Sequence, residues 1–195
     1  MNKTPEALAQ LYMDACLAEL QALKPGNVHI FADGHGMTVH DFIASARASA
    51  TVIALPDLSV GERILKSVSA TRQTVNLNTN LGLILLCAPM IHAAMYGKAQ
   101  AFAECLIQTL SELSIQDATL AAQAIVLASP AGLGEVVEHD VRQPLKVTLL
   151  EMMRAAAHHD HIALQYANGF SDILQSGLTR YRDALKRWGN AAYAT

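Results

Sequence analysis

Apolar residues recur at spacings of three and four along most of this chain, the pattern of helices that bury one face. The first such pattern runs through Leu8, Leu11 and Ala15. It begins after Thr4-Pro5-Glu6, which combines a capping residue, a Pro suited to the first helical position and an acid in the first turn. Lys24-Pro25-Gly26 is expected to end this helix.

The later helix starts are also marked by capping residues. Thr38 with Asp41, Ser59 with Glu62, and Ser114 with Asp117 have the spacing of capping boxes, while Pro144 and Asp160 are expected to open two more helices. The expected helices after the first cover about residues 38–54, 59–73, 81–96, 99–113, 115–128, 144–158, 160–176 and 179–188.

The most apolar stretch, residues 81–95, is short for a bilayer span and contains Pro89 and His92. We therefore expect a buried central helix, and Pro89 is a candidate position for a kink in it. No segment shows the alternation of a strand. The prediction is a single all-α domain over residues 1–195, a bundle of about eight helices around this apolar helix.

Composition narrows the function classes. The chain is 52% hydrophobic and 16% charged, which argues against disorder, and its formal net charge of −3 without a basic stripe argues against nucleic-acid binding. Cys16, Cys87 and Cys105 are far apart in apolar runs and are expected to be buried, reduced thiols. No signal-like apolar segment follows Met1, so a cytoplasmic protein without a membrane association is expected.

Three polar segments lie where helices should begin or end: residues 24–37, 76–82 and 135–142. Phosphates bind readily at such places, because free N–H groups and the helix dipole attract anions. The middle segment is the most informative, since Asn78, Thr79 and Asn80 precede the buried helix. One alternative is that Thr79 or Asn80 only caps that helix.

Metal and nucleophile motifs are weak. His158, His159 and His161 cluster at a helix junction and are expected to be solvated, since no zinc-site spacing is present. Asp33, Asp140 and Asp172 are candidates to hold Mg²⁺ with help from substrate phosphates.

Several of these runs resemble the triphosphoribosyl-dephospho-CoA synthase family. They are Glu19, Lys24-Pro25-Gly26 followed by a Gly/His loop, Asp41-Phe42-Ile43-Ala44-Ser45, and Asn78-Thr79-Asn80-Leu81-Gly82, with Leu133-Gly134 and His139-Asp140-Val141-Arg142 similar to a divergent branch. The family pattern continues past this point with a Gly-rich segment that is not found here, so the chain resembles the N-terminal and middle part of the family.

The resemblance implies an all-α transferase that uses ATP as substrate, with Mg²⁺ as an expected ion. In the family reaction the 2′-hydroxyl of dephospho-CoA attacks C1 of the ATP ribose and adenine leaves. The product is a precursor of the prosthetic group of acyl carrier subunits. The implied catalytic residues are His35 and Asp140, the implied metal ligands are Asp33 and Asp140, and the implied substrate-binding residues are Glu19, Lys24, Asn27, Asn78, Thr79, Asn80, Gly82, His139 and Arg142.

The chain departs from the family at three points: Asn80-Leu81 replaces His-Lys, Gly36 replaces an Asp, and the Gly-rich segment is missing. Three hypotheses stay open: a transferase with altered specificity, a non-catalytic nucleotide- or cofactor-binding partner protein, for example in one-carbon cofactor biosynthesis, and a structural helical subunit. A binding site requires the polar segments to converge. If a C-terminal part is missing, the apolar face of the last helix should be exposed, buried in a homodimer or covered by a partner.

Overall fold

The computed structural model describes residues 3–22, 28, 36–97, 101–128 and 146–190. In these residues the fold is entirely helical, as predicted, with nine α-helices and one π-helical segment. Their bounds are α1 Pro5–Gln21, α2 Val39–Ile53, α3 Val60–Val75, α4 Leu81–Tyr96, α5 Phe102–Ser111, α6 Ile115–Ala128, α7 Leu149–Ala156, α8 His161–Ala167, η1 Asp172–Gly177 and α9 Leu178–Trp188.

The predicted helix starts are confirmed where the caps are local. Thr4 accepts a hydrogen bond from the N–H of Ala7 at 3.3 Å. Both capping boxes form in α2 and α3. At the start of α6, the Ser114 hydroxyl accepts from the N–H of Asp117 at 3.1 Å. Short-range side-chain bonds therefore fix where most of these helices begin.

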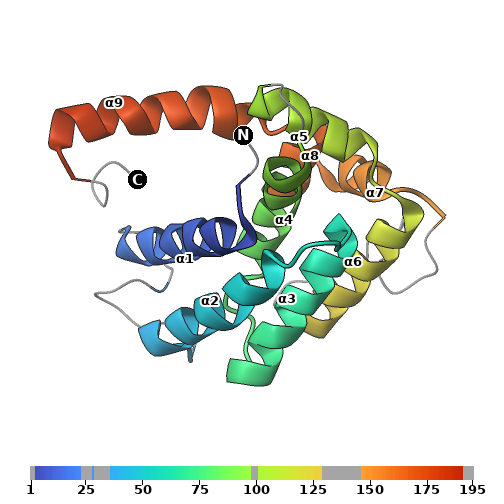
Figure 1. The fold of residues 1–195 in the computed structure, drawn as a ribbon, viewed down its shortest axis with the longest axis horizontal. Coiled ribbons are helices and arrows are strands. Elements are labelled where there is room, and N and C mark those ends of the chain that lie inside the picture. Colours follow the sequence, from blue (N-terminus) through green and yellow to red (C-terminus); the bar gives the residue numbers. More distant parts are fainter. Residues whose placement is uncertain (1–2, 23–27, 29–35, 98–100, 129–145, 191–195) are drawn as a thin grey trace.

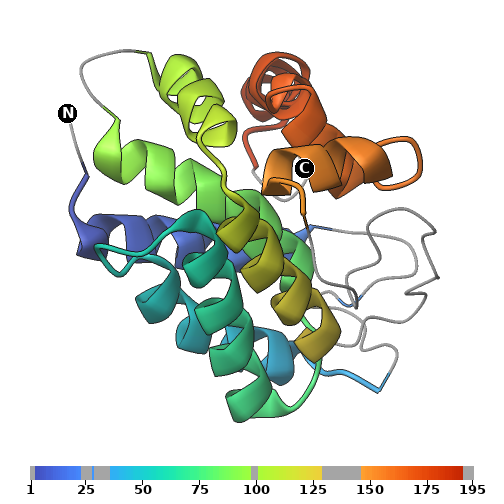
Figure 2. The same cartoon turned by 90° about the vertical axis from the view of Figure 1, so that its right-hand side faces the viewer.

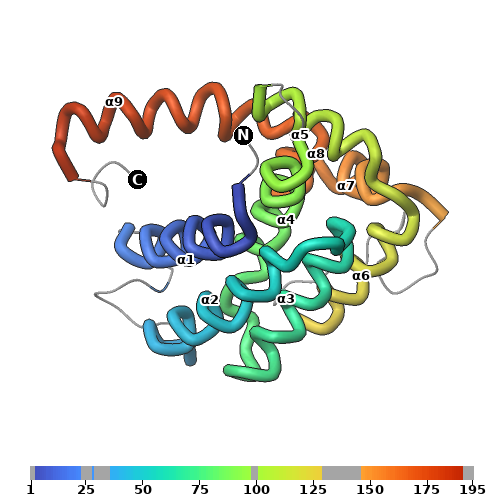
Figure 3. The backbone as a smooth tube through the Cα atoms, in the orientation of Figure 1, coloured from blue at the N-terminus to red at the C-terminus, as the bar shows by residue number. Residues whose placement is uncertain are grey.

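Helix α4 is the centre of the bundle (Figure 1). It buries Ile84, Leu85 and Ala88 along its length. Pro89 lies inside the helix and cannot donate to the carbonyl of Leu85, so that carbonyl accepts from the Tyr166 hydroxyl of α8 at 2.6 Å instead. The tube drawing shows α4 as one continuous helix (Figure 3). The proline is thus compensated by a neighbouring helix.

Two expected helix boundaries in the last third were wrong. The helix expected to open at Pro144 begins at Leu149, because Thr148 forms a capping box with Glu151; Pro144 itself lies outside the described residues. The helix expected over 160–176 ends at Ala167. Gly169 and Phe170 have φ values of 68° and 61°, a left-handed turn that buries the Phe170 side chain completely.

The cysteines and the histidine cluster agree with expectation. Cys16 and Cys105 are buried in the core, Cys87 is half-buried, and none of the three forms a disulfide bond. His158, His159 and His161 are exposed, and the rings of the first two lie edge to face at 4.2 Å. Among the described helices, none combines the length and apolar character needed to cross a bilayer.

Candidate functional site at the start of α4

The helix ends that border the three polar segments face one side of the molecule. Figure 2 shows the end of α1, the starts of α2 and α4 and the end of α6 on the same side. Helices α3 and α6 begin together, since the Gly61 N–H donates to Asp117 Oδ1 at 2.7 Å. Because the two helices pack along their length, their ends also lie near each other. Thr71 near the end of α3 bonds Asn80 at the start of α4.

The turn before α4 is joined directly to α2. Thr79 Oγ1 donates to Ser45 Oγ at 2.6 Å, and Ser45 in turn donates to the carbonyl of Asp41 at 2.6 Å. Thr79 is half-buried, so its hydroxyl lies at the boundary between core and surface. This contact connects two runs of sequence that are 34 residues apart.

Asn80 is held deeper in the core. It is 6% exposed, its Nδ2 donates to Ser49 Oγ at 3.1 Å, and its Oδ1 accepts from Thr71 Oγ1 at 3.1 Å. Its side chain does not cap α4. The Asn78 side chain is closer to that role, since its Oδ1 accepts from the N–H of Leu81 at 3.4 Å. The alternative that Asn80 only caps the helix is therefore wrong.

Ser49 extends this group to α1. Its hydroxyl donates to the carbonyl of Ser45 at 2.7 Å and lies 3.1 Å from the Tyr12 hydroxyl. Because the single proton of Ser49 is used by Ser45, Tyr12 is the donor of the second bond. We call Tyr12, Ser49, Thr71 and Asn80 the neutral network; its members come from α1, α2, α3 and the residue before α4.

The neutral network carries no charge at neutral pH. Burial raises the pKa of Tyr12 well above its usual range. The neighbouring Cys16 thiol, also buried, has its pKa raised to about 11. Ser, Thr and Asn do not titrate in this range. The network can therefore position groups and hold hydrogen bonds, but it does not supply a base or a thiolate nucleophile.

Gly82 lies in the first turn of α4 where α8 approaches closely. A Cβ added at this position would come within 3.1 Å of Ile162 Cδ1, so packing restricts the residue here to glycine or requires Ile162 to move. The preceding residue, Leu81, is half-buried and packs against the core. These two positions thus face the protein interior at least in part.

The remaining expected site residues divide into two groups. Glu19 is half-buried in the last turn of α1, near the helix end that precedes Lys24. Lys24, Asn27, Asp33, His35, His139, Asp140 and Arg142 lie outside the described residues. The described residues contain no cluster of three or more His, Cys, Asp or Glu side chains that would hold a metal ion.

A comparison with protein families decides what this arrangement belongs to. The family model described as ATP:dephospho-CoA triphosphoribosyl transferase matches residues 5–195. The chain belongs to this family. The searches of curated proteins and of solved structures found no match.

Members of the ATP:dephospho-CoA triphosphoribosyl transferase family use ATP as substrate and serve the biosynthesis of a coenzyme A-related prosthetic group. The two family-like runs that are described, residues 41–45 and 78–82, meet through the bond between Thr79 and Ser45. Sequence reasoning missed Tyr12, Ser49 and Thr71. Of these three residues, Ser49 was the easiest to predict from the sequence, because it follows Ser45 by one helical turn on the same face.

Proposed function

We propose that this chain transfers the triphosphoribosyl group of ATP to a hydroxyl of dephospho-CoA or a related nucleotide, with release of adenine. The observation that carries the proposal is the contact of the two family-like runs, where Thr79 Oγ1 donates to Ser45 Oγ at 2.6 Å. Family motifs distant in sequence that meet at a helix start are typical of a ligand site.

The reaction exchanges one bond at C1 of the ATP ribose for another. The bond from C1 to the adenine nitrogen breaks, and a bond from C1 to the acceptor oxygen forms. The acceptor hydroxyl gives its proton to a base, and the departing adenine takes up a proton. A catalyst therefore needs a base beside the hydroxyl, a donor beside adenine, and cations on the triphosphate.

We assign the base, or a metal ligand, to His35 or Asp140, and a phosphate contact to Lys24. Asp33 and Asp140 are the candidate ligands for Mg²⁺, which would act together with substrate phosphate oxygens. His139 and Arg142 are further candidates for substrate contacts.

At the start of α4 we assign substrate contacts to Asn78 and Thr79, which are half-buried and thus border the surface. Asn80 has both ends of its amide bonded to Thr71 and Ser49, so we reassign it from substrate binding to positioning of the turn. Gly82 allows the close approach of α8 and acts in the same indirect way.

We also assign a substrate contact, such as a bond to a ribose hydroxyl, to Glu19. Its side chain is half-buried in the last turn of α1, at the helix end that precedes Lys24 in the sequence.

A second function is favoured by one observation: Asn80 is buried and Leu81 packs on the core where the family pattern has His-Lys. These residues offer no positive charge to a phosphate. Under this alternative the chain binds a nucleotide or cofactor without turning it over, as a partner protein.

The test measures adenine release from ATP by chromatography, with dephospho-CoA and Mg²⁺ present. We expect wild type to release adenine, and Thr79→Val to lower kcat/KM by about tenfold or more. Thr74→Val is the matched control, because Thr74 is exposed and its hydroxyl bonds only the Ala70 carbonyl of its own helix. Calorimetric ATP binding without adenine release would favour the non-catalytic alternative. Neither binding nor release would contradict both.

A further inference from the structure

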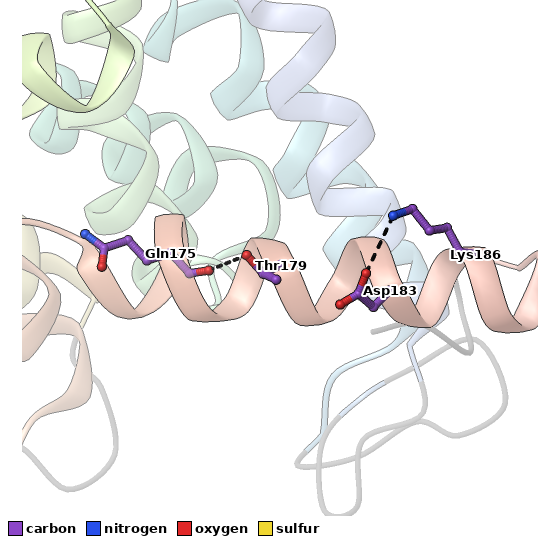
Figure 4. A network of polar contacts seen from close by, with 4 residues as sticks. All are labelled: Gln175, Thr179, Asp183 and Lys186. Atoms are coloured by element: carbon purple, nitrogen blue, oxygen red, sulfur yellow. Dashed lines mark hydrogen bonds and ion pairs between the residues drawn. The ribbon is translucent and has the colours of Figure 1, made fainter.

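Helix α9 differs from the other α-helices in burying none of its residues. It continues directly from η1 and projects along the edge of the molecule (Figures 1 and 3). Polar contacts of its side chains lie within the same helical run, such as the Thr179 hydroxyl to the Gln175 carbonyl at 2.6 Å and the ion pair of Lys186 with Asp183 at 3.7 Å (Figure 4). Burial of an apolar face normally stabilises a helix of 11 residues, and no residue of α9 is buried in this structure.

The sequence of α9 is strongly amphipathic. Leu178, Tyr181, Leu185 and Trp188 follow the three- and four-residue spacing of one helical face. Leu178 and Leu185 are each 37% exposed and Trp188 is 59% exposed. The rest of the helix carries four basic residues and one acid, namely Arg180, Arg182, Lys186, Arg187 and Asp183. An exposed apolar face on an otherwise charged helix is typical of a contact surface.

The same chain has an apolar groove of matching character. It has a volume of about 360 Å³ and is lined almost wholly by apolar atoms from α1, α4 and α5; its walls include Leu8, Leu11, Ala15, Cys87, Met90 and Phe102. Leu11 is 50% exposed and Phe102 is 38% exposed. The groove and the α9 face are thus two separate exposed apolar surfaces.

The charges around the two surfaces are opposite. Helix α1, which forms one wall of the groove, contains Glu6, Asp14 and Glu19 and no basic residue. Asp14 lies one turn after Leu11 on the same exposed strip, while Lys3 lies at the beginning of the groove. The basic flanks of α9 therefore suit the acidic rim of α1.

We propose that α9 of one copy packs its apolar face into the α1–α4–α5 groove of a second copy, forming a symmetric dimer. Gly177 and Leu178 have helical angles, so α9 continues from η1 without a turn that would redirect it. Ile173 and Leu174 of η1 pack against the core and fix its direction. A twofold axis would bury both α9 helices and both grooves at once. This inference goes beyond the proposed function and does not depend on it.

The first test is the molar mass of the full chain by light scattering and sedimentation across a concentration series. We expect a dimer, and we expect Leu185→Asp in α9 and Leu11→Asp in the groove each to weaken it by about 30-fold or more. The matched control is Val126→Asp, at an exposed position of α6 outside the groove, which should leave the dimer unchanged. Circular dichroism checks that each variant is folded.

A crosslinking experiment identifies the contact. A mixture of Leu11→Cys chains with Leu185→Cys chains should give, on mild oxidation, a product of twice the chain mass that neither chain forms alone in the same yield. An internal crosslink in the double variant, without the product from the mixture, would overturn the proposal by placing α9 on its own groove. A wild-type chain that stays monomeric at all concentrations would also overturn the proposal. The same holds if the monomeric chain binds vesicles of anionic lipid through α9.

Discussion

The two ends of α4 are both held by buried polar side chains, but those at its start are neutral and those at its other end are charged. At the start, Asn80 joins Ser49 and Thr71 by hydrogen bonds between uncharged groups. At the other end, the fully buried Arg63 donates to the carbonyls of Ile53 and Leu55 at 2.8 and 2.6 Å.

The charged end has further members close by. Arg63 Nη2 lies 3.6 Å from Met95 Sδ, and its guanidinium carbon lies 6.0 Å from the centre of the Tyr96 ring. Burial lowers the pKa of Arg63, an effect that the Tyr96 hydroxyl opposes. Asp117 bonds Gly61 at the start of α3, next to this end. We call Arg63 and Asp117 the charged end.

The difference indicates a division of labour. The charged end connects the ends of different helices, and we expect it to contribute mainly to the free energy of unfolding. A buried guanidinium is destabilising unless its hydrogen bonds are made. The neutral network fixes the turn that carries Asn78 and Thr79 without adding a charge beside the substrate site that we propose there. Changes at the charged end should therefore act on the free energy of unfolding, and changes at the network on activity as well.

The largest expected effect is at Arg63. Arg63→Met keeps much of the volume but leaves the carbonyls of Ile53 and Leu55 without their donor, so we expect a loss of about 2–4 kcal/mol in the free energy of unfolding. Urea denaturation measures it. Arg154→Met, at an exposed position of α7, is the control and should change stability by less than about 0.5 kcal/mol. Equal effects of the two changes would show that Arg63 does not hold this end.

Asp117 should give the charged end a pH dependence. Burial alone would raise its pKa, but hydrogen bonds from Ser114 and the Gly61 N–H outweigh burial and lower it. A lowered pKa gives stability that is complete above about pH 4, the unfolded value, and is lost as pH falls through the folded pKa. Asp117→Asn should therefore cost about 2 kcal/mol at pH 7, and its difference from wild type should narrow towards pH 3. A difference that stays constant with pH would argue against an ionised Asp117 as the source.

Asn80 tests the neutral network. Asn80→Ala removes the acceptor of the Thr71 hydroxyl and one of the two bonds that the Ser49 hydroxyl accepts, and we expect a loss of about 1–2 kcal/mol in the free energy of unfolding with no change between pH 5 and 8. Thermal unfolding at several pH values measures it. Gln73→Ala, at an exposed position of α3, is the control. A pH-dependent loss would contradict the neutral character of the network.

Thr79 is expected to separate activity from stability. Thr79→Val removes the bond to Ser45 and should lower the free energy of unfolding by only about 1 kcal/mol, while adenine release falls much further. Thr79→Ser keeps the hydroxyl and should restore most of the activity. Rescue of stability but not of activity would show that the methyl group of Thr79, and not its bond to Ser45, matters for the reaction.

The sequence predicted those parts of the fold that depend on neighbours along the chain. Thr38 with Asp41 and Ser59 with Glu62 form their caps within one turn, so the pattern alone fixed these starts. The break after Ala167 could not be predicted, because Phe170 takes a left-handed conformation in order to reach the core beside Tyr166, with ring centres 5.5 Å apart. Gly169 was the one local sign of it.

The arrangement at the start of α4 was predicted in part for the same reason. Asn78 and Thr79 stood out as polar residues before an apolar helix, and the structure places Thr79 against Ser45 of the other described family-like run. The inward direction of Asn80 depends on Ser49 and Thr71, which come from two other helices and carry no signal of their own. Side-chain direction in a bundle is set by tertiary partners, which local sequence patterns do not contain.

The central claim is that the two family-like runs meet at the start of α4 to form the site of triphosphoribosyl transfer. The most direct measurement is adenine released from ATP by the purified wild-type chain with dephospho-CoA and Mg²⁺, compared with Thr79→Val and Thr74→Val. The account predicts release by wild type and Thr74→Val and a loss of about tenfold or more for Thr79→Val. Equal release by all three chains, or none by the folded wild type, would contradict it.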